Sequence, residues 1–252
     1  IPSVAPSNTG LYTLTATNSC GSVVSNPFAF NTIIAPTVNP QGPFQGCGTY
    51  TTSISLSATP MAGSTFNWTA ANSGTATGGA SGGGPSINPS LSSGPSGGTV
   101  TYSVRATNSG CMGSPSNITV AVNKIPAAPT FNTPANPICE GQIKVITATS
   151  VTPSIFEWYD APTGGTLART SPASVTTDNF STPPLPLTSF YIYFAQTIDA
   201  NGCISPRGQV NFPVNPKPNA LISYSGPTIC LGQSVSLNIN LVSCLLYTSP
   251  SP

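Results

Sequence analysis

Apolar and polar residues alternate along several short stretches of the chain. Residues 51–58, 100–106 and 189–195 show a period of two over at least part of their length, and residues 118–122 form a further run rich in Val and Ile. Such alternation places apolar side chains on one face of a β-strand. The chain also contains 28 Pro and 24 Gly, and both residue types destabilise the interior of a helix. The pattern predicts an all-β fold.

Proline and tryptophan recur at a fixed interval. Pro36, Pro126 and Pro216 follow one another at steps of 90 residues, and Trp68 and Trp158 are also 90 positions apart. A constant interval of this size indicates a tandem array of similar structural units. The chain is therefore predicted to consist of modules of about 90 residues.

Six of the seven cysteines form two series with a step of 91 or 92 residues. The first series is Cys47, Cys139 and Cys230, and the second is Cys20, Cys111 and Cys203. Within each full repeat, the first cysteine precedes the second by 64 positions. We expect the disulfides Cys47–Cys111 and Cys139–Cys203, each stabilising its module by about 4 kcal/mol. Cys20 and Cys230 would then have partners beyond the chain.

Two other roles are open to these cysteines. They would serve as small apolar core residues if they stayed reduced. Metal ligation is disfavoured, because the chain has no His and no Cys-x-x-Cys spacing. A disulfide framework would place the protein in an oxidising compartment.

Each module carries large aromatic residues at matched places. The predicted core aromatics are Trp68, Trp158, Tyr12, Tyr102 and Tyr193. A Trp on one strand and a Tyr shortly before the second cysteine are typical of an immunoglobulin-like β-sandwich, in which two sheets pack their inner faces around a large ring. The alternative is that the tryptophans are exposed and stack on sugar rings.

The repeat divides the chain into five segments. These are 1–35, the C-terminal part of an immunoglobulin-like (Ig-like) module; 36–125, a whole module; 126–216, an Ig-like module; 217–243, the N-terminal part of a further Ig-like module; and 244–252, a tail outside the repeat. Proline-rich joints separate the modules and would act as semi-rigid spacers.

Charged residues make up only 4% of the chain, and the net charge is +1. Average globular proteins carry about 25%, and nucleic-acid binding proteins concentrate Lys and Arg on one face. No apolar stretch approaches the roughly 20 residues that span a bilayer. The sequence therefore argues against nucleic acid as a partner and against membrane insertion of this segment.

Candidate catalytic groups are few. Without His, no Ser-His-Asp arrangement exists. Glu157 and Asp160 are three residues apart and invite comparison with a glycosidase pair, but strand and turn roles explain them better. Asp199 offers one carboxylate to calcium, which prefers several, so a plain turn at residues 199–202 is favoured. We expect no enzyme activity, no cofactor and no metal.

Two sets of short motifs resemble known bacterial repeats. In the third segment they are 138–141 (ICEG), 158–161 (WYDA), 163–166 (TGGT) and 201–206 (NGCISP), and in the second they are 66–68 (FNW) and 101–111 (TYSVRATNSGC). The first set resembles the Ig-like repeats of large Bacteroidetes surface proteins, and the second resembles the PKD-like repeats of the same proteins. The resemblance implies an extracellular or cell-surface protein, often exported by the type IX secretion route.

The last nine residues, 244–252 (CLLYTSPSP), break the repeat. They resemble the translation of a transposase adapter used in sequencing libraries. We therefore expect Cys244 not to belong to the protein.

These observations lead to two functional hypotheses. The first is a non-catalytic structural or adhesive repeat segment of a large exported bacterial surface protein. Its partners would be the neighbouring Ig-like modules, surface glycans or other cell-surface proteins, and repetition would supply avidity. The alternative is an accessory carbohydrate-binding region of a secreted polysaccharide-degrading enzyme, which requires exposed aromatic rings.

Overall fold

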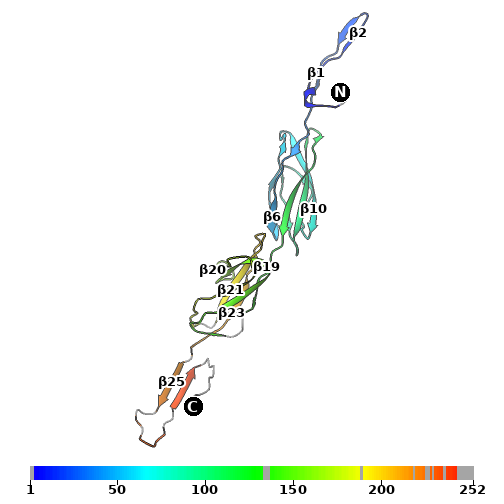
Figure 1. Cartoon of the computed structure of the whole chain (residues 1–252). Coiled ribbons are helices and arrows are strands. Elements are labelled where there is room, and N and C mark those ends of the chain that lie inside the picture. Colours follow the sequence, from blue (N-terminus) through cyan, green and yellow to red (C-terminus); the bar gives the residue numbers. More distant parts are fainter. Residues whose placement is uncertain are drawn as a thin grey trace. The chain divides into compact units, whose positions relative to one another are not determined.

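The computed structural model describes residues 3–132, 137–187, 190–217, 219–224, 228, 230–234 and 237–242. The chain forms two compact units, Ile1–Lys124 and Ile125–Pro252. Both consist almost wholly of β-strands, and the helical content of the described residues is one short 3-10 turn, Pro6–Asn8 (Figure 1). The prediction of an all-β fold is confirmed.

The first unit begins with a narrow β-ribbon. Its strands are β1 (Gly10–Tyr12), β2 (Thr15–Asn18), β3 (Gly21–Val24) and β4 (Phe28–Phe30). β1 pairs with β4 and β2 pairs with β3, both antiparallel. None of the described residues from 3 to 35 is buried, because two paired strands offer no second layer to cover an apolar face.

A β-sandwich follows the ribbon in the same unit. Its larger sheet contains β6 (Phe44–Cys47), β10 (Ser64–Gly74), β11 (Gly82–Gly83), β14 (Gly98–Asn108), β15 (Cys111–Met112) and β16 (Ser116–Asn123). Their order is β11-β10-β14-β16-β6, with β15 added to β14. The facing layer consists of three short pairs: β5 (Thr37–Val38) with β9 (Ala58–Thr59), β8 (Ile54–Ser55) with β12 (Ser86–Ile87), and β7 (Thr49–Thr51) with β13 (Ser90–Ser92).

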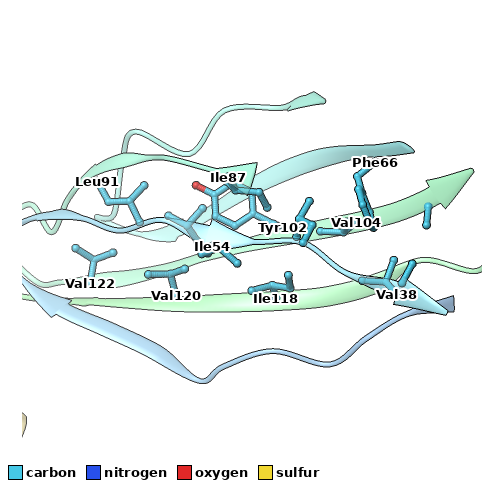
Figure 2. Packing of buried hydrophobic residues seen from close by; sticks show 14 of the residues in the cluster. Val38, Ile54, Phe66, Ile87, Leu91, Tyr102, Val104, Ile118, Val120 and Val122 are labelled. Atoms are coloured by element: carbon cyan, nitrogen blue, oxygen red, sulfur yellow. The ribbon is translucent and has the colours of Figure 1, made fainter. Parts of the chain in front are cut away.

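The core of this sandwich follows from the alternation in the sequence. Val100, Tyr102 and Val104 point inward from β14, and every second residue of β16 from Ile118 onward does the same. Short strands of the facing layer supply aliphatic side chains such as Ile54, and Figure 2 shows these buried residues gathered between the two layers. Period-two patterning thus places one apolar face of each strand in the core.

The second unit contains a second sandwich and a terminal hairpin. Its strands are β17 (Thr130–Asn132), β18 (Ile138–Cys139), β19 (Val145–Tyr159), β20 (Leu167–Thr170), β21 (Val175–Ser181), β22 (Tyr191–Ile198), β23 (Gly208–Phe212), β24 (Val214–Asn215), β25 (Asn219–Tyr224) and β26 (Leu237–Val242). β25 and β26 form the hairpin. The remaining strands build the sandwich (Figure 1).

One long strand, β19, takes part in both layers of this sandwich. Its first half pairs with β17 and β21, and its second half pairs with β20 and β22. The register shifts between Thr149 and Ser154, on either side of Pro153. Proline has no backbone N–H to donate to a ladder. The strand therefore leaves one sheet at this point and continues in the other.

The core of the second sandwich is centred on Trp158, which is fully buried. Its ring stacks on Phe180 with centroids 4.9 Å apart, and Phe131 contacts it edge-on at 5.9 Å. The indole Nε1–H donates a 2.8 Å hydrogen bond to Asp178. Asp178 is in turn paired with Arg169, whose Nη1 and Nη2 lie 2.9 and 3.0 Å from its carboxylate oxygens. The buried acid is thus neutralised and fully hydrogen-bonded, as burial of a charge requires.

The other predicted core aromatics have different surroundings. Tyr102 is fully buried, while Trp68 and Tyr193 are half-buried and pack against the margins of their cores. Tyr12 departs from the expectation, because it is 42% exposed in the ribbon. Its ring contacts only Phe30 among the described aromatic pairs, at 6.1 Å. The ribbon has no facing sheet against which a Tyr12 side chain could be buried.

Two expectations from the sequence concern the ends of the molecule and the membrane. The tail at 244–252, including Cys244, lies outside the described residues. Within the described ranges, no helix is long and apolar enough to cross a bilayer.

Candidate functional site

A groove of about 340 Å³ lies on the first sandwich beside Trp68. Its walls come from β10, from the glycine-rich segment after it, from the end of β12 and from β14. The lining residues are Trp68, Gly78, Ala80, Ser81, Ile87, Asn88, Pro89, Ser90 and Tyr102. The groove therefore combines aromatic rings with hydroxyl and amide groups and contains no charged side chain.

The indole of Trp68 forms one side of the groove. Its Nε1–H donates a 3.1 Å hydrogen bond to the carbonyl oxygen of Ala80, which anchors the ring to the glycine-rich segment. A Cβ atom at Gly82 would lie 2.9 Å from the indole. Glycine at this position therefore lets the backbone approach the ring closely, and the ring stays half-buried with one part facing the groove.

Tyr102 lies at the floor of the groove and carries an unusual hydroxyl. The residue is fully buried, and its Oη has no hydrogen-bond partner among the described residues. Figure 2 shows the ring among aliphatic side chains, with Ile87 close to it. Burial raises the pKa of this phenol above its usual range, because an apolar environment disfavours the charged form. An unpaired buried hydroxyl costs the fold about 1–3 kcal/mol, and burial closes this one off from solvent.

Asn88 supplies an amide at the rim of the groove. Its Nδ2 donates a 3.0 Å hydrogen bond to the Ser86 hydroxyl, which leaves its carbonyl oxygen available as an acceptor. Ser81 also lines the groove. Its hydroxyl oxygen accepts a hydrogen bond from the Ala70 N–H at 3.1 Å. Neutral donors and acceptors around an aromatic ring suit a neutral, hydroxyl-rich ligand.

The tryptophan of the second sandwich, Trp158, is fully buried among the described residues. Trp158 is enclosed by Phe131 and Phe180, and its Nε1–H is already bonded to Asp178. The hypothesis of exposed sugar-stacking rings thus fails for Trp158 and remains open for Trp68. The sequence predicts a core position for both tryptophans. The interval of 90 residues indicates the strand on which each ring lies, but it does not indicate which residues cover the ring.

Glu157 and Asp160 each accept hydrogen bonds from neighbouring residues. Glu157 accepts hydrogen bonds from the Tyr159 hydroxyl at 2.9 Å and from Gln196 Nε2 at 2.7 Å. Asp160 accepts the Thr166 N–H at 2.7 Å and so closes the turn after β19. Both carboxylates therefore have structural partners.

Asp199 likewise shapes a turn. Its Oδ1 accepts the N–H groups of Asn201 and Cys203, both at 2.9 Å. Among the residues that the structure describes, no group of three or more His, Cys, Asp or Glu side chains is placed to hold a metal ion. The turn interpretation accounts for Asp199 without a ligand.

The cysteines of the first sandwich lie at opposite ends. We call the end where the chain enters a sandwich its near end and the end where it leaves its far end. Cys47 pairs with Asn123 in the parallel β6–β16 ladder, at the far end. Cys111 pairs with Asn108 beyond the other end of β14, and a side chain at Gly113 would collide with the Pro36 carbonyl, which marks the near end.

The second sandwich has the same arrangement. Cys139 pairs with Asn215 in the β18–β24 ladder, where the chain leaves. Cys203 follows β22 in a turn next to the start of β23. A side chain at Gly208, the first residue of β23, would collide with the carbonyl of Pro129, where the chain enters. The first-series cysteine is thus at the far end and the second-series cysteine is at the near end.

This arrangement places the members of the expected pairs Cys47–Cys111 and Cys139–Cys203 at opposite ends of their sandwiches. Cys47 and Cys203 are both disulfide-bonded, and Cys111 is a free thiol. The 11 residues of β14 separate the two ends of the first sandwich. At about 3.3 Å per residue, they hold Cys47 and Cys111 about 35 Å apart. A spacing of 64 residues does not return the chain to the same end.

Each of the two sandwiches matches a known domain family. Residues 44–126 match the PKD-like domain, and residues 126–216 match the Ig-like domain described as CHU_C associated. The chain carries a PKD-like domain followed by an Ig-like domain. Both kinds of domain are found in bacterial surface proteins, and both are non-catalytic. The predicted resemblance and the prediction of tandem immunoglobulin-like sandwiches are confirmed.

Solved structures with tandem modules are distantly similar. The FN1-FN3 domains of chicken CNTN1 share 13% identity, covering 80% of this chain and 74% of that chain, with a TM-score of 0.36. Extracellular domains 3-5 of Drosophila OTK share 19%, covering 86% and 74%, with a TM-score of 0.34. The BSP domain of a biofilm associated protein shares 18%, covering 71% and 29%, with a TM-score of 0.26. No curated protein matches the chain.

Proposed function

We propose that this chain is a non-catalytic structural and adhesive segment of a large exported bacterial surface protein. The observation that carries the proposal is the succession of two sandwiches, each with its own closed core and each matching a domain type found in such proteins. Ig-like domains with a disulfide are typical of exported proteins. Export by the type IX route stays a prediction from the resemblance to Bacteroidetes repeats.

The proposal includes the extent of the modules. Residues 36–125 and 126–216 would be whole modules, while 1–35 and 217–243 would be parts of two more. Support for the first partial module comes from its exposed apolar side chains, such as Leu11 at 74% and Phe28 at 67%. Tyr12 stands 90 positions before the buried Tyr102. A facing layer supplied by further chain would bury these residues.

A spacer built of independent modules should unfold stepwise under force. With its disulfides reduced, the chain held at its two ends should give two separate events. Each would release about 30 nm, because a module of about 90 residues extends by roughly 3.3–3.6 Å per residue. Single-molecule force spectroscopy measures these steps. One cooperative event for both sandwiches would contradict independent modules.

An adhesive repeat should bind weakly as one copy and strongly as many. Beads coated with the full chain at increasing density should adhere to bacterial or glycan-coated surfaces with a steep dependence on density, as avidity predicts. The same surfaces should retain little of the monomeric chain in solution. If the beads fail to adhere at every coating density, the adhesive role is contradicted and only the spacer role stands.

The groove beside Trp68 favours a second candidate, binding of a neutral carbohydrate. An indole face covers the apolar side of a pyranose ring, while Asn88 and Ser81 line the groove with polar groups. The absence of charge in the lining suits uncharged sugars better than acidic ones. This candidate agrees with the alternative role as an accessory carbohydrate-binding region.

A glycan array probed with the full chain tests this candidate. Signals on neutral glycans should fall at least tenfold in Trp68→Ala and in Asn88→Ala, while Trp158→Phe, altered in the closed core of the other sandwich, should keep them. Asn88→Ala guards against a general loss of fold, because its described side-chain contact is one exposed hydrogen bond to Ser86. Equal binding of the three variants to neutral glycans, or no binding by the parent chain, would contradict the carbohydrate proposal.

A further inference from the structure

One sheet of the second sandwich has an outer face that carries exposed isoleucines. The sheet consists of β20, the second half of β19, β22 and β23. Ile155, Ile192 and Ile204 on this face are 37%, 45% and 51% exposed, and Ile198 lies between the first and the last. We call this surface the isoleucine face. We propose that it binds the same face of a second copy of the chain.

The register of the strands joins these side chains into one surface. Phe156 and Trp158 of β19 point into the core, so Ile155 between the ladder and the solvent points outward. Ile198 stands opposite Ile155 in the β19–β22 ladder and opposite Ile204 in an isolated bridge. Residues directly opposite each other lie on the same face of a sheet. The three isoleucines therefore form a row across the sheet.

The corresponding face of the first sandwich is polar. There β14 lies between the tryptophan strand β10 and β16, as β22 lies between β19 and β23. The outward residues of β14 are Thr101, Ser103, Arg105 and Thr107, whereas those of β22 are Ile192, Phe194, Gln196 and Ile198. A sandwich of this kind thus does not need an apolar outer face. Exposed apolar patches of this sort mark sites of protein interaction.

A charged row crosses the same face beside the isoleucine row. Gln196 in its centre donates a 2.7 Å hydrogen bond to Glu157 Oε2 and accepts one of 3.1 Å from Arg207 Nε. The guanidinium of Arg207 also lies over the Tyr159 ring, 3.4 Å from its centroid. These contacts hold both charged side chains in place before any partner arrives, which lowers the entropic cost of binding.

Each of the two charges keeps free hydrogen-bonding capacity. The bonds that Glu157 accepts both end on Oε2, and the bonds that Arg207 donates start from Nε and Nη1. Among the described residues, Glu157 Oε1 and Arg207 Nη2 have no hydrogen-bond partner. A carboxylate oxygen and a guanidinium nitrogen are therefore available to groups of opposite charge on another molecule.

The order of these residues makes the face complementary to itself. A two-fold axis along β22 places each residue on the β19 side opposite the residue at the same height on the β23 side of the second copy. Glu157 then faces the second copy's Arg207, and Ile155 faces the second copy's Ile204. Opposite charges meet and apolar side chains leave water. Because both rows match under one rotation, a second copy is the occupant that the face fits.

The size of the face indicates a weak, reversible contact. β22 has 8 residues and is about 26 Å long, and four strands are about 19 Å wide. The face thus offers about 500 Å² per copy, below the roughly 800 Å² of a stable interface. Weak contacts of this kind gain strength where many copies stand side by side. Lateral association of neighbouring copies goes beyond the spacing and adhesion proposed above.

Sedimentation analysis of the full chain over a wide range of concentrations tests the proposal. The parent chain should pass from monomer to dimer as the concentration rises. Ile204→Asp should weaken the dimer at least about tenfold, because it buries a charge opposite an isoleucine. Val145→Asp is the matched control and should leave the dimer unchanged, since Val145 is 52% exposed on the first half of β19, which belongs to the other sheet.

An exchange of charges between two variants gives a sharper readout. Glu157→Arg and Arg207→Glu should each stay monomeric, because like charges would then face each other across the two-fold axis. An equimolar mixture of the two variants should form a heterodimer, in which every facing pair has opposite charges again. Neither variant regains its own internal hydrogen bonds on mixing, so recovery reports the contact between copies and not the fold of either chain.

Several results would overturn the proposal. They are a parent chain that stays monomeric at every concentration, equal dimerisation of Ile204→Asp and Val145→Asp, and a mixture of the charge variants that stays monomeric. A monomeric parent whose adhesion on coated beads is lost in Ile204→Asp would assign the face to a different partner. None of these results bears on whether the chain is a non-catalytic segment of a surface protein.

Discussion

Trp68 and Trp158 occupy the same place in two successive repeats and have different roles. Trp158 is sealed by two aromatic rings and bonded to an ion-paired Asp178, whereas Trp68 is half-buried and bonded to a backbone carbonyl beside a groove. The interval of 90 residues fixes the strand and the face, and the neighbouring segment decides what covers the ring. In the second sandwich that segment is the regular strand β21, and in the first it is a glycine-rich loop.

Replacement of each tryptophan by alanine should give the largest difference in stability between the two sandwiches. Trp158→Ala should lower the free energy of unfolding of the second sandwich by about 3–5 kcal/mol, as expected for a fully buried aromatic. Trp68→Ala should cost the first sandwich about 2 kcal/mol, because part of its surface already faces solvent. Urea denaturation of the full chain measures both, and the unaltered sandwich in each variant serves as the internal control. Equal losses would show that the two rings are equally important to their cores.

Replacement of Asp178, the acid beside Trp158, should cause the next largest loss of stability. Asp178→Ala removes the partner of Arg169 and of the Trp158 Nε1–H and should cost about 2–3 kcal/mol. Arg169 is one-third exposed, so water compensates part of the loss. Asp178→Asn keeps one acceptor and should cost less. Asp160→Asn, in an exposed turn of the same module, is the matched control with an expected cost below about 1 kcal/mol. An unchanged free energy of unfolding in Asp178→Ala would show that this carboxylate does not stabilise the core.

The hydroxyl of Tyr102 should show an effect of the opposite sign. Tyr102→Phe deletes an unpaired buried polar group and should raise the stability of the first sandwich by up to about 1 kcal/mol. Tyr193→Phe, at the margin of the other core, should change stability by less than about 0.5 kcal/mol. Thermal unfolding of the two variants makes the comparison. A loss of stability in Tyr102→Phe would reveal a partner for this hydroxyl, such as a water held in the groove.

The smallest expected effect is a dependence on alkaline pH. Burial raises the pKa of Tyr102 in the folded state, so the unfolded chain loses this proton first, near pH 10. Stability is therefore unaffected by this group below pH 10 and falls as the pH rises through the folded pKa. The urea midpoint of the first sandwich should decline as the pH rises above about 10, and less steeply in Tyr102→Phe. Identical slopes in the two proteins would rule out this contribution.

Tyr12 and Tyr102 show where the repeat pattern stops being informative. Both stand on strands before a second-series cysteine, 90 positions apart, and the same core role was predicted for both. Tyr102 is buried because β8 and β12 cover its sheet, whereas Tyr12 is 42% exposed on a ribbon without a second layer. Alternation in the sequence reports which face is apolar, and only the partner layer turns that face into a core. The groove beside Trp68 has no sequence signal except its glycines.

The sequence by itself determined the all-β class, the interval of the repeat, and the inward positions of β14 and β16. These features depend on local preference and on periodicity, which the chain carries residue by residue. The tertiary structure decided which tryptophan is closed in and at which end of a sandwich each cysteine lies. Sixty-four residues between two cysteines fix how much chain lies between them. The number of strand reversals along that chain, set by the sheet register, decides whether it returns to the same end.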